Sequence, residues 1–398
     1  MTALPQRQVE VSDEPLGLGE TLPGWTYHSA EFLELEKRHL LLTGWQLVCH
    51  VSEVRAAGDF ATLDFMGERA FVIRGEDGEL RAFHNVCRHR AAAVVRGQTG
   101  SCQHAIRCFY HGWTYGFDGR LKAVPGESSF PGLDKARLGL KPLEIEVYLG
   151  FVFVRFAGRG PGVAERMAPY GRELAAYRSA EMVPVRRCWQ VDIAVNWKNL
   201  MDNYLEGYHV PVGHPGLFRL FGNSYEVEAR EGDVCRALGR LRDRDSINWS
   251  ERHYQRVRPP AEHLDEELAT SWRYYTLLPN LSFDVYPEMM DYFQVIPLSP
   301  ERTRLRVRLF GLPGSDRRLR AARWLNMRIN TQVQREDEGL IESVQAGLAT
   351  GAYGNGYFSE KEACLRRLHD MVRAALPVAR LAAPPTPGSM AETNAAMA

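Results

Sequence analysis

Short segments in which hydrophobic and polar residues alternate run from residue 42 to residue 157. Residues 59–65, 69–75 and 79–86 are typical of strands, because successive side chains of a strand point to opposite faces. Glycine-containing turn pairs separate these segments, as expected for hairpins. The pattern predicts a small all-β domain over residues 42–157.

Helical periodicity appears before and after this segment. Residues 30–43 place Phe32 and several leucines near one face of a helix. Beyond a glycine-rich linker at residues 158–162, helical and strand-like segments alternate, and a long helix is predicted over residues 317–348. This α+β pattern predicts a second domain over residues 158–382.

The two ends of the chain differ from these domains. We assign residues 1–41 to an N-terminal segment that includes the first helix. Residues 383–398 combine Pro, Ala and Ser with little that could be buried. This composition predicts a disordered tail.

The composition narrows the class of protein. The 398 residues contain 49 Lys and Arg and 49 Asp and Glu, so the formal net charge is zero, which argues against a general nucleic-acid binder. No apolar run approaches the roughly 20 residues of a membrane span, and the N-terminus does not look like a signal peptide. The seven scattered cysteines are expected to be thiols or metal ligands rather than disulfides. We therefore expect a cytoplasmic protein.

A first group of metal-binding residue types lies in the predicted β domain. Cys87 and His89 form one pair, Cys108 and His111 form another, and eighteen residues separate the pairs. Two cysteines and two histidines suit either tetrahedral zinc or a Rieske [2Fe–2S] cluster, in which the cysteines hold one iron and the histidines the other. The surrounding strands favour the cluster, since zinc fingers more often place the second pair on a helix.

This stretch, from NVCRHR to RCFYHGWTYGFDG, resembles the Rieske domain of the ring-hydroxylating oxygenases. The resemblance implies that Cys87, His89, Cys108 and His111 bind the cluster. Ala91 departs from the family pattern, which has Gly there, but it is not a ligand position.

A second group follows about a hundred residues later. Asp202, Glu206 and His209 have the spacing of one helix face, and His214 lies past Pro211, where the chain can curl back toward that face. Two imidazoles and a carboxylate make the facial triad of non-haem Fe(II) oxygenases. Taken alone, a His-x4-His pair near a carboxylate is a weak signal.

The same family carries a similar segment, usually preceded by Asn-Trp-Lys as in this chain. The resemblance implies that His209 and His214 bind a mononuclear Fe(II). It also implies that Glu206 links an iron histidine to a Rieske histidine of the neighbouring subunit. The Glu206 context looks more like the carnitine and choline monooxygenase branch. The third ligand is expected to be Asp337, with Glu336 as the alternative.

The resemblance further implies the architecture and the partners. We expect an N-terminal Rieske domain and a helix-grip-like catalytic domain with a curved antiparallel sheet. The chain has no Gly-x-Gly-x-x-Gly fingerprint, so a separate flavin or ferredoxin-type reductase is expected to supply electrons from NAD(P)H. Electron transfer between chains implies a closed ring, a homotrimer. Whether a small β subunit is present stays open.

The substrate is less constrained. The stretch 271–295 is expected to line the pocket with aromatic residues: Tyr274, Tyr275, Phe283, Tyr286, Tyr292 and Phe293. These residues would suit a flat aromatic acid, with Arg273 binding its carboxylate, or a quaternary ammonium compound held by cation–π attraction. Hydroxylation and oxidative demethylation both fit the family. A zinc-dependent hydrolase with a structural zinc site, or a Rieske electron-transfer protein with a vacant second site, remains an alternative.

Overall fold

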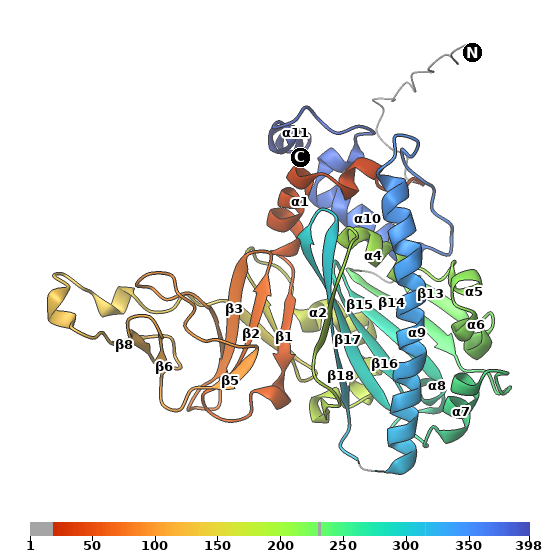
Figure 1. Cartoon of the computed structure of the whole chain (residues 1–398), viewed down its shortest axis with the longest axis horizontal. Coiled ribbons are helices and arrows are strands. Elements are labelled where there is room, and N and C mark those ends of the chain that lie inside the picture. The colour runs from red at the N-terminus through yellow and green to blue at the C-terminus, as the bar shows by residue number, and fades with distance from the viewer. Residues whose placement is uncertain (1–18, 230–231, 315) are drawn as a thin grey trace.

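The computed structural model describes residues 19–229, 232–314 and 316–398. Figure 1 shows a β-rich part, coloured red to yellow, beside a larger part in which a long helix lies across a sheet. The described residues include no helix that is both long enough and apolar enough to cross a membrane.

The β-rich part contains three antiparallel sheets, with strand orders β1-β10-β9, β4-β3-β2-β5 and β6-β7-β8. Its strands are β1 (Gln46–His50), β2 (Asp59–Phe65), β3 (Glu68–Arg74), β4 (Leu80–His84), β5 (Thr99–Ser101), β6 (Ile106–Arg107), β7 (Thr114–Tyr115), β8 (Leu121–Ala123), β9 (Glu144–Tyr148) and β10 (Phe151–Arg155). Single helical turns connect them: η3 (Val51–Glu53), η4 (Glu127–Ser129) and η5 (Lys135–Arg137).

The larger part is built on an eight-stranded antiparallel sheet with the order β11-β18-β17-β16-β15-β14-β13, and β12 also pairs with β18. Its strands are β11 (Val183–Pro184), β12 (Trp189–Ile193), β13 (Tyr225–Ala229), β14 (Val234–Arg240), β15 (Ser271–Leu277), β16 (Leu281–Tyr286), β17 (Met289–Ser299) and β18 (Arg302–Gly311). The α+β fold predicted from the sequence is confirmed.

Helices surround this sheet. They are η1 (Gly24–Tyr27), α1 (Ala30–Glu36), η2 (Lys37–Leu41), α2 (Val163–Met167), η6 (Ala168–Tyr170), α3 (Gly171–Ala176), η7 (Ser179–Glu181), α4 (Trp197–Tyr204), α5 (Val210–Gly213), α6 (Pro215–Phe221), α7 (Trp249–Val257), α8 (Glu266–Ala269), α9 (Arg317–Leu348), α10 (Ala363–Ala375), η8 (Pro377–Arg380) and α11 (Met390–Met397). The Asp316 side chain caps α9 by accepting from the backbone N–H of Leu319.

The two faces of the large sheet have different neighbours. On one face, Tyr274 and Tyr286 pack with Leu325 and Ile329 of α9, which crosses the sheet in Figure 1. On the other face, Phe283 and Tyr292 pack against Phe151 of β10, and Tyr275 packs against Tyr170. Side chains alternate along each strand, so only every second residue of a strand faces the space between the sheet and α9.

The N-terminal segment is fastened to the larger part by a buried ion pair. Lys198 Nζ of α4 lies 2.7 Å from Glu36 Oε1 of α1, and both side chains are fully buried. The Trp197 indole N–H donates to the other Glu36 oxygen, and the Thr26 carbonyl accepts from Lys198. Because most polar atoms of the pair have partners, the charges can remain buried.

The structure differs from the prediction for the end of the chain. We predicted a disordered tail over residues 383–398, but α11 forms there and packs against η8 and α1. Met390 is buried, and the Asn394 side chain accepts from the backbone N–H of Val378. These contacts lie with distant segments, so the local composition could not reveal them.

Candidate metal centres and substrate cavity

Two loops of the β-rich part bring Cys87, His89, Cys108 and His111 together. The first pair lies between β4 and β5, and the second lies between β6 and β7. Both cysteines are buried, whereas His111 is exposed. The Nδ1 atoms of the two histidines are 3.1 Å apart, and the Cys87 thiol adjoins the Cys108 thiol. The donor atoms are therefore sorted by type, sulfur inside and nitrogen toward the surface.

This sorting fits a Rieske cluster better than a single zinc ion. One iron of a Rieske cluster takes the two thiolates and the other takes the two imidazoles, whereas tetrahedral zinc draws all four donors around one point. The Tyr115 hydroxyl lies 3.3 Å from Cys87 Sγ, and the Trp113 ring stacks on His89 with 4.8 Å between centroids. These contacts hold the side chains of Cys87 and His89 in place, one sulfur donor and one nitrogen donor.

The pKa shifts of the cysteine and histidine side chains also suit a bound metal between the two loops. Burial, and then the adjacent Cys87 thiol, raises the pKa of the Cys108 thiol. Desolvation, and then His111, lowers the pKa of His89. Thiolates and neutral imidazoles are the forms that bind metal, so a metal would stabilise the buried thiolates that the protein disfavours.

The departure at Ala91 leaves the first loop intact. Ala91 adopts a left-handed backbone conformation with a φ of 57°, a conformation that Gly adopts more readily than other residues. Its backbone N–H still donates to the Cys87 carbonyl, and the Ala92 carbonyl accepts from the Cys87 N–H. The turn that presents Cys87 is therefore closed on both sides.

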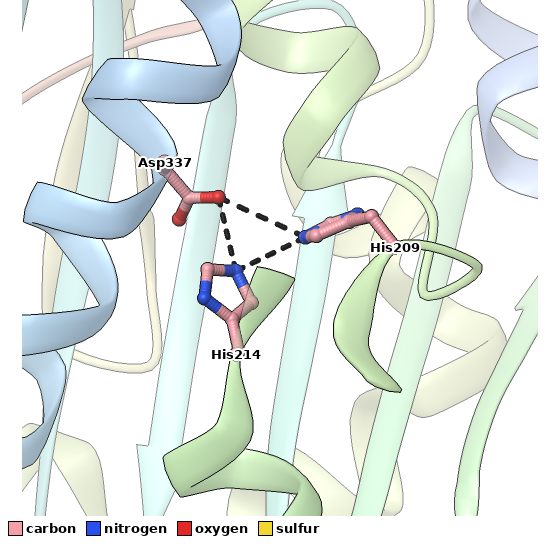
Figure 2. Close-up of side chains that lie close together, drawn as sticks. All are labelled: His209, His214 and Asp337. Carbon is pink, nitrogen blue, oxygen red and sulfur yellow. Dashed lines mark hydrogen bonds and ion pairs between the residues drawn. The ribbon is translucent and has the colours of Figure 1, made fainter. Parts of the chain in front are cut away.

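The second site lies between α5 and α9. Figure 2 shows the side chains of His209, His214 and Asp337 pointing toward one another. The two Nε2 atoms are 3.1 Å apart, and Asp337 Oδ1 lies 3.0 Å from Nε2 of His214 and 3.7 Å from Nε2 of His209. One donor atom from each residue falls within 4.8 Å of the others, which is the arrangement of a facial triad.

A carboxylate orients each histidine from behind. Glu206 accepts a hydrogen bond from Nδ1 of His209, and Glu336 Oε2 lies 2.9 Å from Nδ1 of His214. A carboxylate can only accept, so the proton sits on Nδ1 and the lone pair on Nε2 points inward. Asp337 Oδ1 is buried and has no hydrogen-bond donor. Three lone pairs thus converge on one point, which a metal cation would satisfy.

The electrostatics of His214 point the same way. Burial opposes protonation of His214, but Asp337 and Glu336 outweigh it and raise its pKa. The protein alone therefore favours positive charge at this point. A bound divalent cation would supply that charge without a proton.

Next to this site, a cavity of about 760 Å³ opens between the sheet and α9. His209, His214 and Asp337 lie in its wall. Six aromatic residues share the lining: Trp189, Tyr204, Tyr225, Tyr274, Tyr286 and Phe293. The volume suits a small organic molecule, and aromatic walls are typical of such sites.

Two family models match the chain. The model described as "Rieske [2Fe-2S] domain" matches residues 44–141, and the model described as "Ring hydroxylating alpha subunit (catalytic domain)" matches residues 181–377. The chain belongs to the Rieske ring-hydroxylating oxygenases. The resemblance noted from the sequence is thereby confirmed, and so are the cofactors that it implied, a Rieske [2Fe–2S] cluster and a mononuclear iron.

Several curated relatives are named as monooxygenases of carnitine, choline or glycine betaine. The chain is 32% identical over 209 residues to the carnitine monooxygenase oxygenase subunit of Escherichia coli (strain K12), covering 52% of this chain and 54% of that protein. It is 28% identical over 370 residues to the chloroplastic choline monooxygenase of Arabidopsis thaliana, covering 89% and 82%. The matched stretch thus spans about half the length of the carnitine monooxygenase subunits.

Solved Rieske oxygenases share the fold. A quaternary ammonium Rieske monooxygenase, CntA, in complex with L-carnitine superposes with a TM-score of 0.76 at 24% identity, covering 91% of this chain and 99% of that one. Naphthalene 1,2-dioxygenase from Rhodococcus sp. gives a TM-score of 0.72 at 18% identity, covering 89% and 94%. At these identities the likeness concerns the fold alone.

Within the mononuclear site of this Rieske oxygenase, one part of the sequence prediction needs correction. The helix that carries Asp202 ends at Tyr204, so Asp202, Glu206 and His209 do not share a helix face. Asp202 instead accepts from the Tyr27 hydroxyl at 2.5 Å and pairs with Nε2 of His369 at 3.0 Å. It therefore ties α4 to the N-terminal segment and α10.

The pocket prediction holds for half of the aromatic residues. Tyr274, Tyr286 and Phe293 line the cavity. The other three, Tyr275, Phe283 and Tyr292, lie on the far face of the sheet, as strand alternation requires. Arg273 is also on that face, and it is buried between Glu173 and Glu267. It is therefore unavailable to a substrate carboxylate.

Sequence reasoning missed two acidic residues of the cavity, Asp284 and Asp291. Both are buried on adjacent strands. A signal was present, since each is a lone carboxylate inside an otherwise apolar or aromatic strand. Glu336 was considered only as an alternative ligand, whereas its carboxylate orients His214 from the side away from Asp337.

Proposed function

We propose that this protein is the terminal oxygenase component of a Rieske non-haem iron oxygenase system. The observation that carries the proposal is that three side chains converge beside an aromatic cavity, those of His209, His214 and Asp337. The cluster would be held by Cys87, His89, Cys108 and His111. When bound, the cluster supplies single electrons and the mononuclear iron activates O2 for insertion into a substrate C–H bond. An NAD(P)H-dependent flavin or ferredoxin-type reductase would supply the electrons.

The protein residues set the geometry of that reaction. Glu206 and Glu336 hold the protons of the two histidines on Nδ1, which keeps Nε2 free for the metal. One carboxylate and two imidazoles would hold the iron, and such a set of ligands leaves coordination positions for O2 and substrate. The buried lining excludes water around a substrate that lies there.

We propose a quaternary ammonium substrate rather than an aromatic acid. The cavity offers tyrosine and phenylalanine rings that attract a cation, and the expected carboxylate partner, Arg273, is neutralised on the far face. The relatives are named as monooxygenases of carnitine and choline. Monohydroxylation next to nitrogen, followed by loss of the hydroxylated group, would then be the reaction.

We also propose a homotrimer in which electrons cross between subunits. In Figure 1, the loops around β6 and β8 lie at the opposite end of the molecule from α5. Exposed aromatic residues flank His111, namely Phe109 and Tyr110, and exposed Tyr208 and Val212 flank His209. These patches suit a head-to-tail contact, which must close into a ring. Glu206 would then link His209 to a Rieske histidine of the neighbouring subunit.

A reducing compartment such as the cytoplasm suits this chemistry. All seven cysteines are free, and Cys87 and Cys108 would be needed as thiolates. This part of the proposal would be checked by fractionating cells of the native host.

The test is substrate-dependent O2 uptake by the iron-loaded protein with a ferredoxin-type reductase and NADH. One panel would contain choline, carnitine and betaines, and the other aromatic carboxylates. We expect product matched to O2 use in the first panel. His209→Ala should abolish turnover and leave the cluster spectrum intact, whereas exposed His39→Ala should change neither. Zinc in place of iron, or no turnover in either panel, would contradict the proposal.

The proposed link between subunits has its own test. Glu206→Gln should retain both metals but slow the reoxidation of the reduced cluster by O2 and substrate. The amide can still accept from Nδ1 of His209, so iron binding is expected to survive. Reoxidation at the wild-type rate would remove the role of Glu206.

A further inference from the structure

Two buried carboxylates face the same part of the cavity. Asp284 of β16 and Asp291 of β17 are directly opposite each other in the antiparallel pair. Each residue is only 8% exposed, and both line the cavity beside the mononuclear site. Directly opposite residues have Cβ atoms about 5 Å apart, so like charges at these positions repel.

The surrounding sheet and helices leave these charges uncompensated. Within the described residues, no Arg, Lys or His forms an ion pair with either carboxylate. Asp284 accepts from the Tyr204 hydroxyl of α4 and is 3.4 Å from the Ser282 hydroxyl. The nearest groups on the same row of the sheet are Tyr274 of β15 and Leu309 of β18.

The other titratable groups around the cavity do not change this balance. Those that face the pair are neutral phenols: Tyr204 of α4, Tyr225 of β13, Tyr274 of β15 and Tyr286 of β16. From α9 the cavity receives Asn326, Asn330, Glu338 and Asp337, and Asp337 lies with His209 and His214 at the candidate metal site. The arginines of the lining, Arg186, Arg187 and Arg335, are exposed and lie at the rim. The interior is thus acidic and the rim basic.

Such a pair is costly to ionise without a cation. Burial raises the pKa of Asp284 to about 7, against the hydrogen bonds from Tyr204 and Ser282. Burial, and then the charge of Asp284, raises the pKa of Asp291 well above its usual value. In the empty cavity the two carboxyls therefore keep protons near neutral pH.

We propose that Asp284 and Asp291 bind the positively charged nitrogen group of the substrate, and that this group displaces one proton from the pair of carboxyls. This inference rests on the proposed function, which it deepens by naming the residues that select a cation. The proton balance is simple: protonated carboxyl plus cation gives carboxylate–cation pair plus a proton released to solvent. No bond to carbon changes in this step.

The geometry also explains how a cation without N–H groups can be accommodated. A quaternary ammonium group cannot satisfy a carboxylate by hydrogen bonding, so its attraction is purely that of charge. Asp284 already accepts a hydrogen bond from the Tyr204 hydroxyl. Its carboxylate therefore needs a positive charge nearby rather than a further hydrogen-bond donor. The rings of Tyr274, Tyr286 and Phe293 complete the surroundings by cation–π attraction. Neutral analogues of the same shape would gain neither contribution.

The experiment compares choline with its neutral analogue 3,3-dimethyl-1-butanol, using titration calorimetry on the iron-loaded full-length protein. Measurements in phosphate and in ACES buffer, which both buffer near pH 6.5 and differ in ionisation enthalpy, report protons released on binding. We expect wild type to bind choline more tightly than the alcohol, to release protons on binding choline near pH 6.5, and to release none with the alcohol.

Asp291→Asn and Asp284→Asn test the residues one at a time. Each should weaken choline binding by at least about tenfold, as expected for removal of one partner of a buried charge pair. Each should also reduce proton release and leave the affinity for the alcohol unchanged or higher. The matched control is Asp64→Asn, an exposed carboxylate of β2, which should behave as wild type.

Several outcomes would overturn the inference. These are failure of wild type to bind choline, binding of choline by both variants at wild-type strength, or an equal loss of affinity for choline and for the alcohol. Failure of the proposed function is distinct, because choline could bind with proton release while no ammonium compound supports O2 uptake. Coupled turnover of choline by both variants at unchanged KM would contradict the role of Asp284 and Asp291 in binding the cation. It would not contradict the proposed oxygenase function.

Discussion

The buried Asp284 makes the folded protein less stable as the pH rises, so Asp284→Asn should stabilise it at alkaline pH. Burial raises the pKa of this carboxyl from 3.8 to about 7. A difference of about three pKa units corresponds to roughly 4 kcal/mol of unfolding free energy. The substituted amide can still accept the hydrogen bond from Tyr204, so little packing is lost.

The direction of the effect follows from the raised pKa. Stability from the protonated Asp284 is fully present below pH 4, the range in which the unfolded chain also holds the proton. It is lost progressively as the pH rises toward about 7, where the folded carboxyl ionises. Since the amide does not titrate, the advantage of the variant should grow between these limits and then stay constant.

Thermal unfolding at pH 5 and at pH 8, with equal iron loading, would measure this advantage. A domain of roughly 200 residues shifts its midpoint by about 2–4 °C per kcal/mol, so we expect a gain of about 5–15 °C at pH 8 and a smaller one at pH 5. The exposed Asp64→Asn serves as the control. Equal midpoints for wild type and Asp284→Asn at pH 8, or a loss of similar size at both pH values, would refute the reasoning.

Three further predictions follow from other contacts. Asp337→Asn should lose the mononuclear iron, because Asp337 is the proposed ligand, whereas Glu336→Gln should keep the iron with about 10–100-fold weaker affinity, because Glu336 only orients His214. Iron analysis of the dialysed variants measures this. Loss of iron from Glu336→Gln and its retention by Asp337→Asn would mean that the two roles are exchanged. Tyr115→Phe removes the hydroxyl beside a cluster cysteine and should lower the reduction potential of the cluster in a redox titration; an unchanged potential would count against that contact. Glu36→Gln leaves the charge of Lys198 buried and unpaired, so the free energy of unfolding should fall by about 3–5 kcal/mol and the unfolding midpoint should be lower. A midpoint equal to that of wild type would mean that the pair does not stabilise the fold.

Much of the mononuclear site could be predicted from the sequence because its residues follow a local motif. His209 and His214 are separated by four residues in the sequence, and the short helix α5, which was not predicted, lies between them. The choice between Glu336 and Asp337 could not be made in the same way. Adjacent residues of a helix point about 100° apart, so only the position of α9 over the sheet decides which carboxylate meets the two Nε2 atoms.

Residues that depend on pairing between distant elements were harder to predict. Asp284 and Asp291 become opposite one another only through the register of β16 with β17. The same register decides that Tyr274 faces the cavity and Tyr275 does not. The helix α11 likewise depends on Met390 reaching a core formed by other segments. In each case tertiary context supplies what local composition lacks.

A single-turnover experiment would show whether the two proposed metal sites act together in oxygen insertion. The iron-loaded protein would be reduced chemically without a reductase, mixed with choline and O2, and followed by the cluster spectrum and by product analysis. We predict reoxidation of the cluster together with formation of a hydroxylated or demethylated product in proportion to the cluster oxidised. A cluster that stays reduced, or one that is oxidised without product, would contradict the account.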